Sequence, residues 1–150
     1  MLKYVDTAVT FAEIPDEISL CINISNCPCH CEGCHSAYLA KDIGTDLTQR
    51  ALEQFIKENE YVTCISLMGG DSDPSIINLL GSVIHMRGKK SAWYSGRQEL
   101  SDKIDITNFD YIKLGPYIKN KGPLNNPNTN QRMYKVIDSK LEDITNKFWK

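Results

Sequence analysis

The chain has 150 residues, of which 41% are hydrophobic and 24% are charged, and its net charge is −2. These values are typical of one globular domain over residues 1–150, and they give no support to disorder or to nucleic-acid binding. No apolar stretch approaches the roughly 20 residues of a membrane helix, and the amino terminus lacks the apolar core of a signal peptide, so we expect a cytoplasmic protein that does not contact a membrane.

Strands and helices alternate along most of the chain. Apolar and β-branched runs predict strands at residues 19–24, 62–68, 90–94, 111–114 and 132–137. Apolar residues at helical spacing predict a helix at 47–59, with Asp46 as its N-cap, and another at 74–86, with Asp73 as N-cap and Pro74 as first residue. We also predict a short helix at 96–101, a loop at 119–130 and a terminal helix at 140–150.

This alternation predicts an α/β fold built from parallel βαβ units. A complete eight-fold β/α barrel takes about 250 residues, so this chain is expected to form a partial, open barrel. The active site of such a barrel lies at the carboxyl ends of its strands, and an open side would admit a macromolecule.

The most informative motif is a group of three cysteines, Cys27, Cys31 and Cys34, with the spacing C-x3-C-x2-C directly after a predicted strand. Three thiolates can hold three corners of a cubane iron–sulfur cluster and leave the fourth iron open for chemistry. The alternative is a zinc site, because Cys29 brings the local count to four. Structural zinc, however, usually takes its ligands from two separated knuckles.

The remaining cysteines are interpreted as non-ligands. We expect Cys29 to be a bystander that points away from the cluster. Cys21 and Cys64 lie in strand-like runs and are predicted to be buried core residues.

A second motif, Gly69-Gly70-Asp71, follows the predicted strand at 62–68. Glycines at a strand end let the backbone approach a ligand closely, although a simple turn is also consistent with them.

The cysteine loop resembles that of the radical S-adenosylmethionine enzymes, in which three thiolates bind a 4Fe–4S cluster whose open iron chelates S-adenosylmethionine. The resemblance implies that Cys27, Cys31 and Cys34 are the catalytic cluster ligands. Gly69-Gly70-Asp71 is similar to the Gly-Gly-Glu motif of that superfamily, with Asp71 in place of Glu. This implies that the motif lies near the methionine end of the cofactor.

Nearly the whole chain resembles the activating enzymes of anaerobic (class III) ribonucleotide reductase. Four features carry this resemblance: Gly33 before the third cysteine, the Gly-Gly-Asp form at 69–71, the strand end at 93–96 (Trp-Tyr-Ser-Gly) and the Asn-Gln-Arg segment at 130–132. Two positions depart from the family: His35 stands where Tyr is frequent, and residues 113–115 replace an acidic-Gly pair.

The resemblance also implies cofactor contacts outside the main motifs. The residues concerned are Gly33, Cys34, His35, Ser95 and Lys113. Lys113 at a strand end would face the carboxylate of S-adenosylmethionine, and the alternative is a solvated lysine. His30 is either a cofactor contact or a solvated loop residue.

The function implied is reductive cleavage of S-adenosylmethionine followed by hydrogen abstraction from a glycine of the anaerobic ribonucleoside-triphosphate reductase. A flavodoxin-like electron donor is implied, because the sequence holds no second cluster motif. Three alternatives stay open: an activase of another glycyl-radical enzyme such as pyruvate formate-lyase, a small-molecule radical enzyme, and a zinc-binding interaction module without catalysis.

Overall fold

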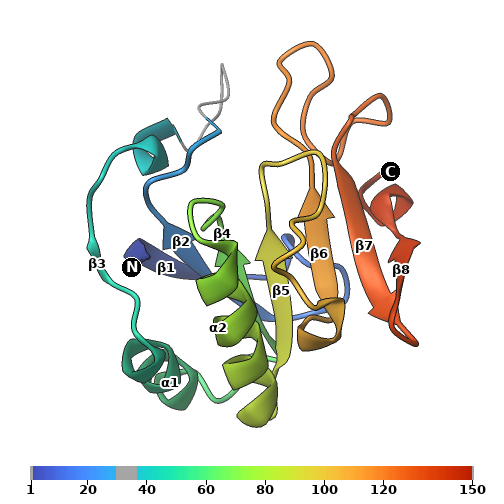
Figure 1. Cartoon of the computed structure of the whole chain (residues 1–150). Coiled ribbons are helices and arrows are strands. Elements are labelled where there is room, and N and C mark those ends of the chain that lie inside the picture. Colours follow the sequence, from blue (N-terminus) through green and yellow to red (C-terminus); the bar gives the residue numbers. More distant parts are fainter. Residues whose placement is uncertain (1, 30–36, 150) are drawn as a thin grey trace.

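A computed structural model of the chain describes residues 2–29 and 37–149, and it centres on one eight-stranded sheet (Figure 1). In chain order the strands are β1 (Lys3–Thr10), β2 (Ser19–Ile24), β3 (Thr45–Asp46), β4 (Cys64–Met68), β5 (Lys90–Tyr94), β6 (Tyr111–Leu114), β7 (Arg132–Ile137) and β8 (Lys140–Asp143). Across the sheet their order is β3-β1-β2-β4-β5-β6-β7-β8. The central strands β2, β4, β5 and β6 pair in parallel, and the strands on both flanks pair antiparallel.

Two α-helices lie in the connections of the parallel strands. Helix α1 (Gln49–Glu58) is capped by Thr48, whose side chain accepts a hydrogen bond from the amide of Ala51. The N-cap prediction of Asp46 was therefore wrong, and Asp46 ends β3 instead. Helix α2 (Pro74–Met86) has the predicted bounds, with Asp73 as its N-cap. Residues 2–29 and 37–149 also contain three 3-10 helices: η1 (Ala37–Ala40), η2 (Ile106–Asn108) and η3 (Thr145–Phe148).

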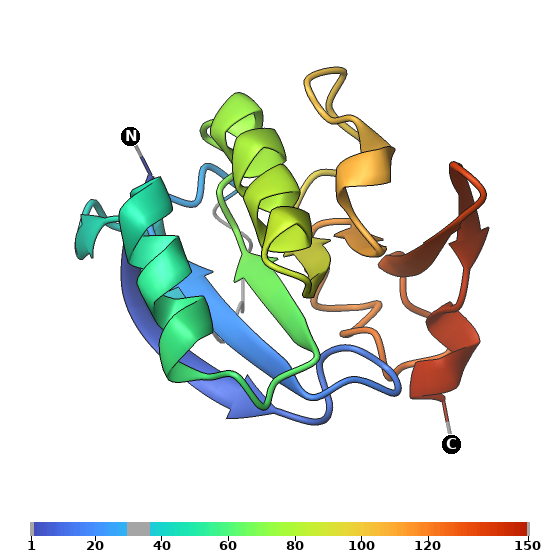
Figure 2. The ribbon, with the colours of Figure 1, turned by 90° about the horizontal axis from the view of Figure 1, so that it is seen from below.

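The two faces of the sheet carry separate apolar clusters, because successive strand residues point to opposite faces. Helices α1 and α2 and the 3-10 helix η2 cover one face (Figure 2). The larger cluster packs there and includes Ile22, Leu67 and Trp93 from the strands. The opposite face holds a smaller cluster around Tyr111 and Met133. Nowhere in residues 2–29 and 37–149 is a helix long and apolar enough to cross a membrane.

The predicted α/β class is confirmed, and the sheet of the described residues is open, with β3 and β8 at its two edges. Two predicted helices were wrong. Residues 96–101 contain no helix, and the tail forms β8 followed by η3. Strand β1 was not predicted, since its residues alternate too weakly and four of them are exposed. The predicted loop at 119–130 is present.

A buried carboxylate joins the parallel strands at their amino ends. Glu17 is 6% exposed, and its oxygens accept hydrogen bonds from Thr63 (2.7 Å), Lys90 (2.8 Å) and Tyr111 (2.9 Å). Thr63 directly precedes β4, while Lys90 and Tyr111 are the first residues of β5 and β6. Burial raises the pKa of Glu17, but the hydrogen bonds from Lys90, Thr63 and Tyr111 outweigh burial, and the net pKa lies below its ordinary value.

We expect Glu17→Gln to lower the free energy of unfolding by about 1–3 kcal/mol at neutral pH, because the substitution removes the charge that Lys90 and Tyr111 bond. A lowered pKa in the folded state stabilises the fold above the ordinary pKa of glutamate, and this contribution disappears as the pH falls through the lowered value. The free energy of unfolding, measured with urea, should therefore differ less between wild type and Glu17→Gln in acid than at neutral pH. Glu99→Gln, on an exposed side chain, is the control. An equal loss at neutral and acidic pH would contradict the charge-based account.

Candidate functional site

The four parallel strands end on one side of the sheet, and those predicted site residues that the structure describes gather there. The cysteine loop follows β2, Gly69 follows β4 and Ser95 follows β5, while Lys113 lies next to the last residue of β6. In Figure 1 these ends form the upper side of the sheet. Ligands of open α/β sheets commonly bind outside the carboxyl ends of the strands.

The backbone at the start of the cysteine loop is fixed by hydrogen bonds. The amide of Asn26 donates to the carbonyl of Lys41 (3.1 Å), and the amide of Cys27 donates to that of Leu39 (2.9 Å). Asn26 adopts a left-handed conformation with a φ of 58°, which turns the chain at the end of β2. The other residues predicted in this loop, which are His30, Cys31, Gly33, Cys34 and His35, lie outside the described residues.

Gly69 and Gly70 are required by the turn itself. Both have positive φ values, 108° and 90°, that favour glycine. A Cβ atom on Gly70 would also lie 2.4 Å from Cδ1 of Ile77. The Gly69 carbonyl accepts a hydrogen bond of 2.6 Å from the indole of Trp93, which is 1% exposed. The turn is thus held from β5, and its geometry explains both glycines; a role in cofactor binding remains a prediction.

Asp71 joins the loop after β4 to the loop after β5. Its carboxylate is buried, with the residue 6% exposed, and each oxygen has a partner. Oδ1 accepts from the hydroxyl of Ser95 at 2.5 Å, and Oδ2 accepts from the amide of Gly96 at 2.8 Å. Hydrogen bonds to an ionised carboxylate are stronger than neutral ones and satisfy a group that would otherwise be costly to bury. Ser95 and Asp71 were both predicted at the site, and the structure brings them into direct contact.

Lys113 is buried, so the interpretation of a solvated lysine was wrong. The residue is 7% exposed, and its amine donates to the carbonyls of Gly115 (2.7 Å) and Ser95 (3.2 Å). It also lies 5.8 Å from the ring centroid of Tyr94. Lys113 therefore joins the loops after β5 and β6 and brings a positive charge to the same edge as Asp71.

The three described cysteines that are not predicted ligands fall into two groups. Cys21 and Cys64 are buried in the sheet, as predicted; burial raises the pKa of Cys21 to about 12 and that of Cys64 well above its ordinary value. Cys29 lies at the carboxyl edge, with its sulfur 3.8 Å from Oδ2 of Asp71. Burial and the charge of Asp71 raise the pKa of Cys29 to about 12.

The segment at 130–132 reaches the same edge from β7. The side-chain amide of Asn130 donates to the carbonyl of Pro116 (3.0 Å) and to Gln98 (3.3 Å). Asn130 thus contacts the loops after β5 and β6. Sequence reasoning missed this contact and the pairing of Asp71 with Ser95, because no spacing pattern relates residues that are 14 or 24 positions apart in loops.

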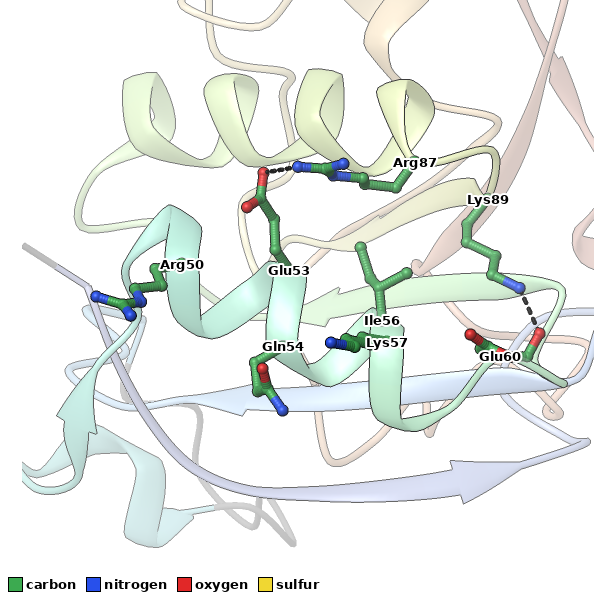
Figure 3. Close-up of a pocket in the computed structure, with 8 residues that line it drawn as sticks. All are labelled: Arg50, Glu53, Gln54, Ile56, Lys57, Glu60, Arg87 and Lys89. Carbon is green, nitrogen blue, oxygen red and sulfur yellow. Dashed lines mark hydrogen bonds and ion pairs between the residues drawn. The ribbon is translucent and has the colours of Figure 1, made fainter.

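A surface pocket of about 600 Å³ lies elsewhere, between α1 and the end of α2 (Figure 3). Two of its basic side chains, Arg87 and Lys89, have polar partners. Arg87 forms an ion pair of 2.7 Å with Glu53, and the amine of Lys89 donates to the carbonyl of Glu60 at 2.6 Å. Lys89 directly precedes β5, so this pocket lies toward the amino ends of the strands. It is separate from the predicted site.

Comparison with known proteins identifies the kind of site. A family model described as a 4Fe-4S single cluster domain matches residues 18–137, which include every predicted site residue. Comparisons with curated proteins and with solved structures found no match. The family match favours an iron–sulfur cluster over the zinc alternative.

We expect Cys27→Ala, Cys31→Ala and Cys34→Ala each to abolish the visible absorption of the cluster after anaerobic reconstitution, because each removes one thiolate ligand. Iron and sulfide analysis should show about four irons per chain in the wild type and a large loss in these variants. Cys21→Ala, in the core of the sheet, should retain the metal and serves as the control. Retention of a full cluster in Cys27→Ala would refute the ligand assignment.

Proposed function

Because the chain belongs to the 4Fe-4S single cluster domain family, we propose that Cys27, Cys31 and Cys34 bind one 4Fe–4S cluster and that the protein uses it to cleave S-adenosylmethionine reductively. The observation that carries this proposal is the three-cysteine spacing in the segment that follows β2, the first of four parallel strands. The donor set suits the cluster, since soft thiolates are the usual ligands of iron–sulfur clusters. Three cysteines leave one iron available to a substrate. When bound, the cluster supplies the electron that breaks the C5′–S bond of S-adenosylmethionine, which gives methionine and a 5′-deoxyadenosyl radical.

The protein's own residues bind and orient the cofactor in this proposal. The turn at Gly69-Gly70 would lie beside the methionine portion of the cofactor, and Lys113 would supply a positive charge for its carboxylate. Support for the second role comes from the burial of Lys113 beside the loops after β5 and β6. Gly33, Cys34 and His35 are proposed to contact the cofactor from the cysteine loop. Asp71 and Ser95 hold the turn and the neighbouring loop through their hydrogen bond.

We propose that the substrate is a protein, the anaerobic ribonucleoside-triphosphate reductase, from which the radical takes a hydrogen atom at the Cα of a glycine. The fold would be a partial β/α barrel of the radical S-adenosylmethionine type, and the openness of the observed sheet supports it. A docked loop of the reductase would deliver the glycine and exclude water from the radical. A flavodoxin-like protein would supply the electron, and the reaction would take place in the cytoplasm.

The test is anaerobic incubation of the reconstituted protein with S-adenosylmethionine, a reductant and the cognate reductase. We expect a glycyl-type EPR doublet on the reductase, with one 5′-deoxyadenosine formed per radical. Without the reductase, cleavage should be slow and uncoupled, because water reaches the site. A reductase with alanine in place of the target glycine is the matched control and should give no doublet.

Three outcomes would overturn the proposal at different levels. A doublet on pyruvate formate-lyase and none on the reductase would change the partner. Efficient turnover of a small molecule without any protein radical would remove the activase function. If the cluster is intact but does not cleave S-adenosylmethionine, the proposed radical chemistry is refuted and only the assignment to the 4Fe-4S family stands.

A further inference from the structure

The side chain of Cys29 occupies a space that the absence of a side chain at Gly96 leaves open. A Cβ atom on Gly96 would lie 2.7 Å from the sulfur of Cys29 and 3.3 Å from its Cβ. The φ of Gly96 is outside the left-handed region, so its backbone conformation does not require glycine. The close approach of Cys29 is therefore the reason why glycine is needed at this position.

The other wall of this space is Asp71. The sulfur of Cys29 lies 3.8 Å from Oδ2 of Asp71, and the same oxygen accepts the amide hydrogen of Gly96. Ser95 holds the second oxygen of the carboxylate. Cys29 thus rests against a group that is already fixed by hydrogen bonds, and the loops after β2, β4 and β5 meet at one point.

We propose that Cys29 is a positioning residue for the cluster loop, and that its side chain anchors the loop in the notch formed by Gly96 and Asp71. Cys29 lies two positions after Cys27 and two before Cys31. The backbone hydrogen bond of Cys27 to Leu39 fixes the start of the loop, and the Cys29 side chain fixes it again before the second predicted ligand. Two anchors within three residues preorganise the thiolates, which lowers the cost of ordering the loop when the cluster binds.

This inference rests on cluster binding by the loop, which is part of the proposed function, but it does not depend on the substrate. It also gives the fourth cysteine of the loop a role other than that of a ligand. A cysteine is small enough for the notch, and its sulfur fills more of the space than the methyl group of alanine.

The experiment compares Cys29→Ala, Gly96→Ala and the double variant after anaerobic reconstitution, and measures the rate at which a chelator removes iron. Loss of a group that supports metal ligands typically weakens metal binding about 10–100-fold. We expect each single variant to assemble the cluster but to lose iron about tenfold faster than the wild type. The double variant should lose iron no faster than Cys29→Ala, because the new methyl group at residue 96 no longer meets a sulfur atom.

Glu99→Ala, on an exposed side chain of the loop that carries Gly96, is the control for a substitution in this loop, and its iron loss should match the wild type. Cys29→Ser, which nearly conserves size, should lose iron more slowly than Cys29→Ala. Circular dichroism of each variant before reconstitution separates a folding defect from a loop defect.

Additive effects of Cys29→Ala and Gly96→Ala would overturn the proposal, because they would mean that the two residues act independently. Wild-type retention of iron in Cys29→Ala would also overturn it. Failure of Cys29→Ala to bind any iron would make Cys29 a ligand instead of a positioning residue. Normal iron kinetics with no cleavage of S-adenosylmethionine would refute the proposed radical chemistry independently of these results.

Discussion

Parallel pairing of β2, β4, β5 and β6 is the constraint on which the rest of this molecule depends. Parallel strands place all their carboxyl ends on one side of the sheet and all their amino ends on the opposite side. The loops that carry Cys27, Gly69 and Ser95 therefore meet without being near one another in the sequence. The antiparallel strands on both flanks extend the sheet, but most loops that carry candidate site residues follow the parallel strands.

Buried charged groups fix both edges of the parallel strands. Glu17 joins the starts of β4, β5 and β6, whereas Asp71 and Lys113 join the loops beyond their ends. A buried charge needs several hydrogen bonds, so each of these groups selects one arrangement of the segments around it. This explains how loops with little regular structure hold a defined shape at the candidate site.

Much of the fold could be predicted from the sequence, because the local signals and the tertiary structure agree in the central strands. The strands at 90–94, 111–114 and 132–137 and helix α2 have the predicted bounds, since their apolar patterns and the Asp73-Pro74 start are strong local signals. The helix predicted at 96–101 is absent. Hydrogen bonds to Asp71 hold Ser95 and Gly96, so the chain does not begin a helix there.

The candidate site was predicted as a set of residues and not as a set of contacts. The cysteine spacing and the Gly-Gly turn are visible in the sequence because they are local. The burial of Lys113 and the position of Cys29 against Gly96 depend on loops from different strands, and no local pattern encodes them. The need for glycine at position 96 can be understood only once the structure shows that Cys29 packs against it.

The hydrogen bond between Trp93 and the carbonyl of Gly69 gives the protein an internal optical reporter. The chain has two tryptophans, and the other, Trp149, bonds the carbonyl of Leu124 near the carboxyl terminus. Replacing Trp149 with phenylalanine would leave the fluorescence of Trp93 alone. Because the Trp93 indole is buried and bonded to the turn after β4, its emission wavelength and intensity follow any rearrangement of that turn. An iron–sulfur cluster nearby would also quench this emission by energy transfer, so metal loading and movement of the turn can be followed on the same side chain.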